Sequence, residues 1–148
     1  MISTKLRLPT LGLLTALAAL SGGCTLESSP NEVAPVSSLG YREAGRAAMI
    51  VEDLGDGRIS GPAEGTSMQP LYGKNAYLVI NPINYDELKP GMVVAYKDLS
   101  GRKVVHALLA KEGKYWTVQG INNAFEDPDY VTPENLLGVV YGSFHAIE

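Results

Sequence analysis

The chain is organised around a short bend with the sequence Gly65-Thr66-Ser67-Met68-Gln69-Pro70-Leu71. Gly65 permits backbone angles that other residues avoid. Pro70 fixes its own φ, lacks an N–H group and biases the preceding residue toward extended geometry. We therefore expect a stiff loop that presents the hydroxyl of Ser67. Taken alone, a motif this short is more typical of a simple turn than of a catalytic loop.

The residues around the bend predict a mainly β fold. Val, Ile, Tyr and Trp gather in short runs bounded by Gly, Pro, Asn and Asp, which is typical of strands joined by turns. These runs cover residues 76–81, 92–96, 103–109, 114–118 and 138–141. Upstream, residues 41–52 are compatible with a helix or a strand, and residues 53–61, rich in Gly and Asp, predict a turn region. We expect a single small domain over residues 41–148.

Composition narrows the possible functions. The 148 residues are enough for one domain with one core, and the net charge is −4 with no basic cluster, so a nucleic-acid partner is not expected. With one cysteine there is no intrachain disulfide, and two histidines without a Cys or His cluster predict no structural zinc site. We expect no metal and no cofactor.

Residues 1–23 have the composition of an export signal. Lys5 and Arg7 supply a short positive region, residues 8–20 are mostly apolar, and small residues lead to the only cysteine, Cys24. The apolar run is short for a membrane span. The small-residue box resembles the lipobox of bacterial lipoproteins, which implies that Cys24 is lipidated and becomes the mature N-terminus. The alternative is a plain secretory signal with an incidental cysteine.

Residues 24–40 predict a flexible tether between the lipid anchor and the domain. This segment is polar, contains prolines and shows no hydrophobic periodicity. We therefore expect an exported protein of the cell envelope, held to a membrane through its N-terminus, with the domain facing the periplasm or the exterior.

A serine hydroxyl needs a base that takes its proton, and the base can be a histidine or a desolvated lysine. The run 103–109 contains both, Lys103 and His106. Residues three apart on a strand point to opposite faces. Without a bulge, only one of the two can face Ser67, and Lys103 is the rival to His106.

The order of these motifs resembles the type I signal peptidase family and its self-cleaving repressor relatives. The bend matches the pattern Gly65-x-Ser67-Met68-x-Pro70, and residues 117–127 are similar to the Thr-x-Gly-Asp-Asn-Asn box of the family. The resemblance covers residues 64–142. It implies a signal peptidase-like β-ribbon or partly open barrel that carries a serine peptidase site.

The resemblance also implies roles for individual residues. The run 103–109 is similar to the histidine-type enzymes of archaea and the endoplasmic reticulum, which makes Ser67 the nucleophile and His106 the general base. Asp127 occupies the position of the aspartate that orients the imidazole, with Asp129 and Glu126 as fallbacks. The backbone N–H of Ser67 is the expected donor to the oxyanion.

These residues predict an envelope-anchored serine endopeptidase that cleaves extended peptide segments. The alternative is a catalytically degenerate peptide-binding lipoprotein on the same fold. It is motivated by Ile121 and Met92, where the family has aspartates, and by Ala107, where it has an arginine. A structural envelope lipoprotein without a ligand is a third hypothesis.

Overall fold

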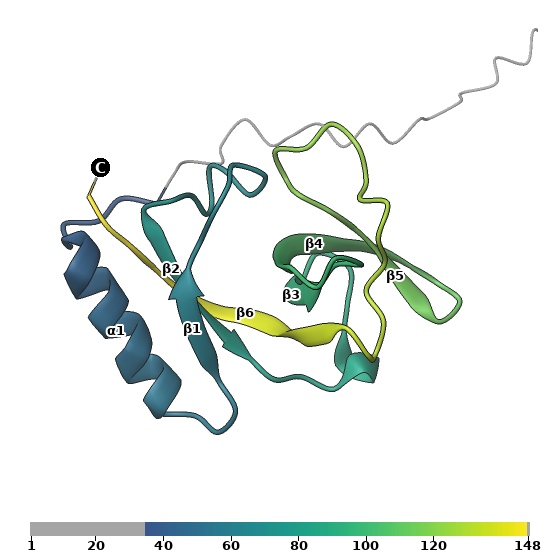
Figure 1. Cartoon of the computed structure of the whole chain (residues 1–148), viewed down its shortest axis with the longest axis horizontal. Helices are drawn as coiled ribbons and strands as arrows, with labels where there is room; N and C mark the ends of the chain where they lie inside the picture. Colours follow the sequence, from purple (N-terminus) through teal and green to yellow (C-terminus); the bar gives the residue numbers. More distant parts are fainter. Residues whose placement is uncertain (1–34, 148) are drawn as a thin grey trace, which may run out of the picture.

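The computed structural model describes residues 35–147, which form one antiparallel six-stranded sheet with an α-helix beside it (Figure 1). The predicted mainly β class is confirmed. The predicted export signal (1–23), the lipidation site at Cys24 and the tether up to residue 34 lie outside the described residues. Among the described residues, no helix is long and apolar enough to cross a membrane.

The elements follow the predicted runs closely. In chain order they are α1 (Tyr41–Asp53), β1 (Ile59–Pro62), β2 (Ala76–Asn81), the short 3-10 helix η1 (Tyr85–Glu87), β3 (Val93–Lys97), β4 (Lys103–Glu112), β5 (Tyr115–Gln119) and β6 (Leu136–His145). Across the sheet the order is β1-β2-β6-β3-β4-β5. β1 and β5 are therefore free edges, and the sheet is not closed into a barrel.

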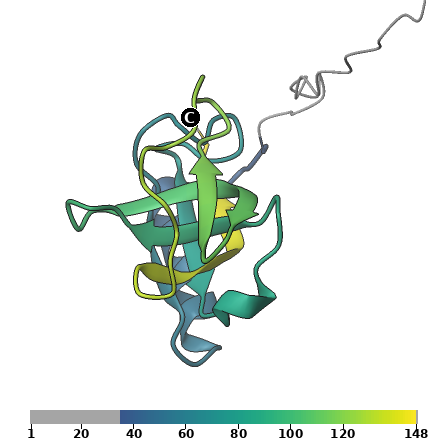
Figure 2. The same cartoon turned by 90° about the vertical axis from the view of Figure 1, so that its right-hand side faces the viewer.

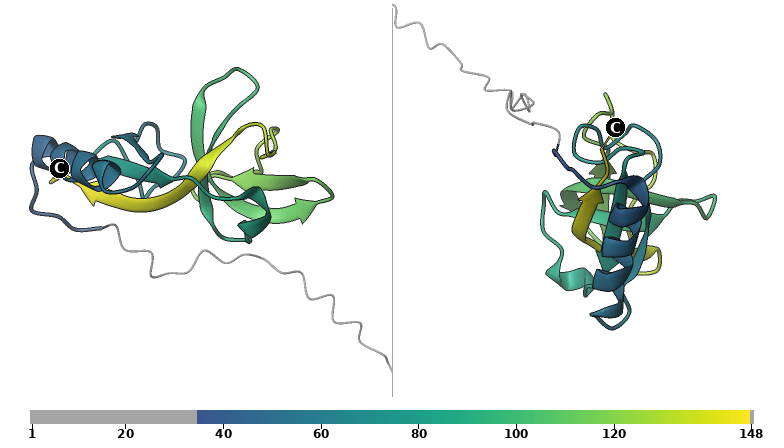
Figure 3. Two further views of the ribbon diagram at one scale, coloured as in Figure 1. Left: turned by 90° about the horizontal axis from the view of Figure 1, so that it is seen from below. Right: turned by 90° about the vertical axis from the view of Figure 1, so that its left-hand side faces the viewer.

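Strand β6 joins the two halves of the sheet. Its second part pairs with β2, from Val139 to His145, and its first part pairs with β3, from Leu136 to Val139. The left view of Figure 3 shows β6 passing from the half that contains α1, β1 and β2 to the half that contains β3, β4 and β5, and Figure 2 views the molecule from the side of this second half. The two halves are turned relative to each other, so the sheet is strongly twisted, as is usual for antiparallel sheets.

Residues 41–52, for which the sequence left helix and strand open, form helix α1. Its buried side is made of Ala44, Gly45 and Ala48, of which Ala48 follows the other two by four and three residues, as a helical face requires. These residues are small, which lets the helix lie close to β2: a Cβ atom on Gly45 would stand 3.0 Å from the ring of Tyr77.

The prediction of a turn over residues 53–61 is wrong at its end. Strand β1 already begins at Ile59, and it pairs with β2 from Ile59 opposite Ile80 to Pro62 opposite Tyr77. Gly61 and Pro62 are poor strand formers, so pairing with β2 rather than local propensity forms this strand. Proline is tolerated because β1 lies at the edge of the sheet.

The hydrophobic residues form two clusters, which follows from the alternation of side chains along the strands. The first contains Leu88, Val94, Tyr96, Leu108, Trp116, Val118 and Val131. The second contains Leu78, Ile80 and Ala95, with Ala63, Tyr72, Val105, Leu137 and Val140 packed against them. Val94 and Tyr96 thus face one cluster, and Ala95 between them faces the other.

Candidate active site

The structure brings together the three residues that the sequence nominated for catalysis. Ser67 Oγ lies 2.9 Å from His106 Nε2, and His106 Nδ1 is hydrogen-bonded to Asp127 Oδ2. An ionised carboxylate can only accept, so Nδ1–H donates to Asp127 and Nε2 is left to accept from the Ser67 hydroxyl. The imidazole is therefore held in the tautomer that a general base requires.

Strand pairing fixes the position of His106, the candidate base. His106 lies in β4 opposite Val94 of β3, and it is buried, with 7% of its surface exposed. Its neighbour on the same face is Val104, which lies opposite Tyr96. Because both strands are rigid elements in an unbroken register, the imidazole has little freedom to move.

Lys103 takes the opposite face of the same strand. The register between β3 and β4 is continuous from Lys97 opposite Lys103 to Val93 opposite Ala107. No bulge therefore separates Lys103 from His106, and residues three apart point to opposite faces. Lys103 is exposed, and none of the hydrogen bonds of residues 35–147 joins it to Ser67.

Ser67, the candidate nucleophile, lies in a loop that is hydrogen-bonded to a second loop. Gly65 has a positive φ of +79°, a conformation that glycine adopts without strain. The Asn122 backbone N–H donates to the Ser67 carbonyl oxygen at 2.8 Å, and the Asn122 side-chain amide donates to the Thr66 carbonyl oxygen at 3.0 Å. Met68 is buried and anchors the bend in the core.

A glycine makes this close approach possible. Gly120 lies just before Asn122 and is buried. A Cβ atom at Gly120 would stand 2.7 Å from the Ser67 carbonyl oxygen and 2.8 Å from the Ser67 Cβ. Any larger residue would push the two loops apart.

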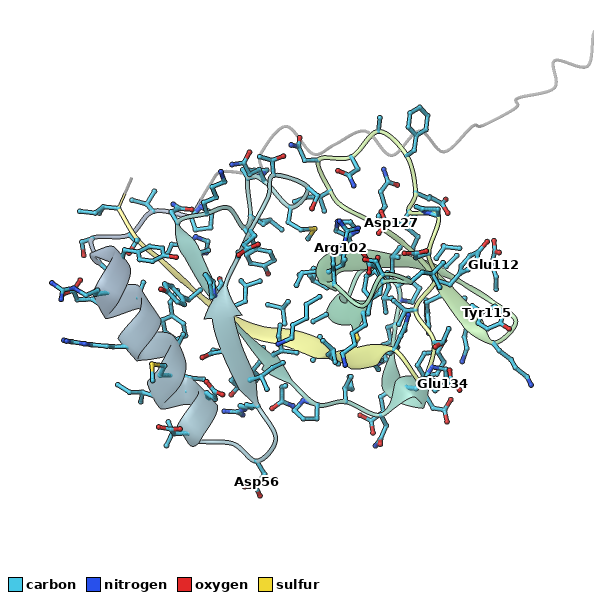
Figure 4. All side chains as sticks on the ribbon, in the orientation of Figure 1. Asp56, Arg102, Glu112, Tyr115, Asp127 and Glu134 are labelled. Carbon is cyan, nitrogen blue, oxygen red and sulfur yellow. The ribbon has the colours of Figure 1, made fainter. Side chains whose placement is uncertain are left out.

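Asp127 rather than its acidic neighbours reaches the imidazole. It lies in the connection between β5 and β6, which carries it to β4 (Figure 4). Its backbone N–H donates to the Val118 carbonyl oxygen at 2.9 Å. The Asp129 carboxylate instead accepts from the Leu99 backbone N–H at 3.3 Å, and Glu126 is exposed.

A fourth residue, which the sequence did not single out, contacts the carboxylate. The Tyr96 hydroxyl donates to Asp127 Oδ2 at 2.6 Å. Burial raises the pKa of Tyr96 well above its ordinary value, and the hydrogen bond to Asp127 adds to this rise. The phenol therefore keeps its proton and remains a donor at every pH of interest. The only signal in the sequence was a tyrosine in a predicted strand.

The Ser67 N–H is the oxyanion donor that the sequence predicted. No backbone hydrogen bond of residues 35–147 engages it, so it is free to donate. The three residues that depart from the family pattern are all at least partly buried. Ile121 and Ala107 are half-buried, and Met92 packs against the first hydrophobic cluster.

A groove with a volume of about 850 Å³ is lined by Ser67 and His106. Its apolar floor is the second hydrophobic cluster, including Leu78, Ile80, Ala95, Val105 and Leu137. Strand β1 and the following residues line one side, and the first part of β4 lines the other. Glu64 and Lys103 add one charge of each sign.

Both strands beside the groove have unpaired edges. The Leu108 N–H donates to the Met92 carbonyl oxygen, and the Arg102 carbonyl oxygen accepts from the Asp98 N–H. In β4 the backbone N–H and C=O groups of the even-numbered residues therefore point toward β3. The backbone groups of Lys103 and Val105 then point away from β3. β5 pairs with β4 only from Ala107 onward, which leaves this stretch without a partner strand in the described part of the chain.

The second histidine takes no part in this line of hydrogen bonds, although its ring stacks on that of Tyr72, which follows the Ser67 bend. His145 is buried in β6, with its Nε2 3.1 Å from Ser143 Oγ, and burial lowers its pKa. Within residues 35–147, His, Cys, Asp and Glu do not gather in any group that could hold a metal ion.

Comparison with known proteins adds no identification. No protein-family model matches the chain, and no curated protein is significantly similar to it. The function must therefore be inferred from the residues and their arrangement.

Proposed function

We propose that this chain is an envelope-anchored serine endopeptidase of the signal-peptidase type. The observation that carries the proposal is the line of hydrogen bonds from Ser67 Oγ through His106 to Asp127, with 2.9 Å between Oγ and Nε2. The three residues come from two loops and a strand, and they meet in the order nucleophile, base and orienting acid.

In the acylation step, Ser67 Oγ attacks the carbonyl carbon of a peptide bond. A new C–O bond forms while the hydroxyl proton passes to His106 Nε2. The imidazolium is stabilised by Asp127, to which its Nδ1–H already donates. The Ser67 N–H donates to the oxyanion. When the C–N bond breaks, Nε2 returns the proton to the leaving amine.

In the deacylation step, water takes the place of the amine. Nε2 accepts a proton from the water as its oxygen attacks the acyl-enzyme carbonyl. The ester bond then breaks, and the proton returns from Nε2 to Ser67 Oγ. Both steps use the same tautomer of His106, which Asp127 maintains.

The substrate is an extended peptide that adds as a strand in the groove. The N–H and C=O groups of Val105 and Lys103 face away from β3, and an extended peptide can pair with them by main-chain hydrogen bonds. Every second side chain of such a peptide would face the apolar floor, where Ala95, Leu137 and Ile80 lie. Apolar side chains two residues apart are the expected preference.

The anchor is part of the proposal. The signal-like residues 1–23 and the single cysteine support export and lipidation of Cys24. Growth of a bacterial host with labelled palmitate should label the full chain, and Cys24→Ser should abolish the label. A labelled Cys24→Ser variant, or an unlabelled wild type that is exported, would refute the lipid anchor and leave a secreted enzyme.

The catalytic proposal is tested with the purified full chain and a mixed peptide library read by mass spectrometry. Wild type should cleave, while Ser67→Ala and His106→Ala should not. The matched controls are Ser143→Ala and His145→Gln, which change the same residue types in β6 outside the hydrogen-bonded line. Both controls should cleave like wild type.

The other outcomes separate the alternatives. Cleavage by His106→Ala but not by Ser67→Ala would transfer the role of base to Lys103. Cleavage by Ser67→Ala would refute the serine mechanism altogether. Peptide retention by every form, without cleavage by any, would establish the peptide-binding lipoprotein.

A further inference from the structure

We infer that Tyr96 is a positioning residue that holds the Asp127 carboxylate against His106. This inference rests on the proposed peptidase function. Tyr96 has no route to a substrate, because it is buried in the first hydrophobic cluster with 1% of its surface exposed. Its hydroxyl acts on Asp127, and through Asp127 on the base.

The geometry of the carboxylate supports this role. The Tyr96 hydroxyl and the His106 Nδ1–H converge on the same oxygen, Asp127 Oδ2. Two donors from different directions fix the position of that oxygen more tightly than one. The charge-assisted hydrogen bonds that result are stronger than bonds between neutral groups.

The elements that carry the three side chains explain why the Asp127 carboxylate requires a second donor to hold it in place. Tyr96 and Val94 lie on one face of β3, and the register places Val94 opposite His106. Phenol and imidazole are therefore held by neighbouring strands. Asp127 comes from the irregular connection between β5 and β6, where its backbone has the hydrogen bond to the Val118 carbonyl oxygen. The phenol links this connection to the strand pair.

The Tyr96 hydroxyl keeps the proton that its hydrogen bond to Asp127 requires. Burial and the hydrogen bond to Asp127 both raise the pKa of Tyr96. The O–H group therefore stays protonated over the pH range in which a histidine base works. Tyr96→Phe would remove the donor and keep the ring that fills the core.

The test is NMR of the histidine ring protons in the full chain, which has only two histidines. A hydrogen bond to a carboxylate should give the His106 Nδ1–H a far-downfield resonance that exchanges slowly with water, and His145→Gln assigns it. Tyr96→Phe should broaden this signal or remove it, and Asp127→Asn should remove it. The matched control is Tyr85→Phe, whose lost hydroxyl donates to the Lys114 and Val131 carbonyl oxygens.

Tyr85→Phe should leave the signal unchanged. With a peptide that the wild type cleaves, Tyr96→Phe should lower kcat roughly 10-fold to 100-fold, the scale of a small misplacement of a catalytic group, with little change in KM. A wild-type signal in Tyr96→Phe, or an equal loss in both Tyr→Phe variants, would overturn the inference. If Tyr96→Phe does not fold, 3-fluorotyrosine in place of Tyr96 should shift the signal, and an unshifted signal would overturn it.

The two proposals fail separately. The NMR signal needs no substrate, so a chain that cleaves nothing but whose signal depends on Tyr96 refutes the peptidase function alone. A chain that cleaves peptides with the same kcat and signal in Tyr96→Phe refutes the role of Tyr96 alone.

Discussion

Gly120→Ala should damage the proposed active site without replacing any of the three residues assigned to catalysis. The added Cβ would stand 2.8 Å from the Ser67 Cβ and 2.7 Å from the Ser67 carbonyl oxygen. Since carbon atoms pack at roughly 3.5 Å or more, the loops must separate by about 0.7 Å to relieve the overlap. The same movement stretches the hydrogen bond between the Asn122 N–H and the Ser67 carbonyl oxygen.

The consequence for catalysis follows from the distance between nucleophile and base. Ser67 Oγ now lies 2.9 Å from His106 Nε2. A shift of about 0.7 Å away from the ring would take it to about 3.6 Å, beyond hydrogen-bond distance. We expect kcat to fall roughly 100-fold. Overpacking should also lower the free energy of unfolding by about 1–3 kcal/mol.

The assay is urea unfolding together with the rate of cleavage of one library peptide. The control is Gly142→Ala in β6, where the nearest heavy atom to the new Cβ is a Phe144 ring carbon at 4.0 Å. That variant should unfold and cleave like wild type. If Gly120→Ala matched Gly142→Ala in both measurements, the close approach of the two loops would affect neither cleavage nor stability. That result would refute the argument from the Gly120 contacts.

Three further predictions concern single side chains. Lys103→Gln should cleave peptides at a rate close to that of wild type, because Lys103 lies on the opposite face of β4 from His106; a loss comparable to that of His106→Ala would contradict the assignment of the base. Met68→Ala should lower the free energy of unfolding by about 2–5 kcal/mol, since Met68 is buried, whereas Met68→Leu should cost less than about 1.5 kcal/mol. Burial lowers the pKa of His145 below 6.5, so its contribution to stability should be complete above that pH and be lost as the pH falls through the folded pKa. Urea titrations at several pH values should show that the free energy of unfolding falls less on acidification in His145→Gln than in wild type. Identical dependence on pH in the two proteins would contradict this.

The strands could be predicted because their signal is local. Val, Ile and Tyr in short runs between turn residues located β2 to β5 to within three residues at each end, while both β4 and β6 proved longer than expected. Helix α1 was ambiguous because Met49 and Ile50 extend an apolar run, yet both are exposed. The residues that decide the helix are the small ones, Ala44 and Ala48, whose burial depends on β2.

The candidate site could be predicted only in part, because some of its residues have a local sequence signal and others do not. Ser67 and His106 stand in short patterns whose residue types already suggest a nucleophile and a base. Tyr96 has no such pattern around it, and Gly120 lies in the box at residues 117–127, which does not by itself show what the glycine contacts. The role of Tyr96 depends on Asp127 reaching it from a later connection, and the role of Gly120 depends on a loop from a distant part of the chain. Contacts of this kind arise only in the folded chain.

The departures from the family pattern bear on whether the proposed site is active, and their positions weaken the case for degeneracy. Ile121 lies beside Asn122, whose backbone and side chain tie the nucleophile loop in place. Ala107 follows His106 on the opposite face of β4, and Met92 packs in the core. None of the three interrupts the line of hydrogen bonds from Ser67 Oγ to Asp127, so their substitution alone gives no reason to expect an inactive protein. The weakest part of the proposed machinery is instead the oxyanion site, for which the Ser67 N–H is the one donor assigned among the described residues. A slow enzyme with an intact nucleophile and base is therefore a better expectation than a binding protein.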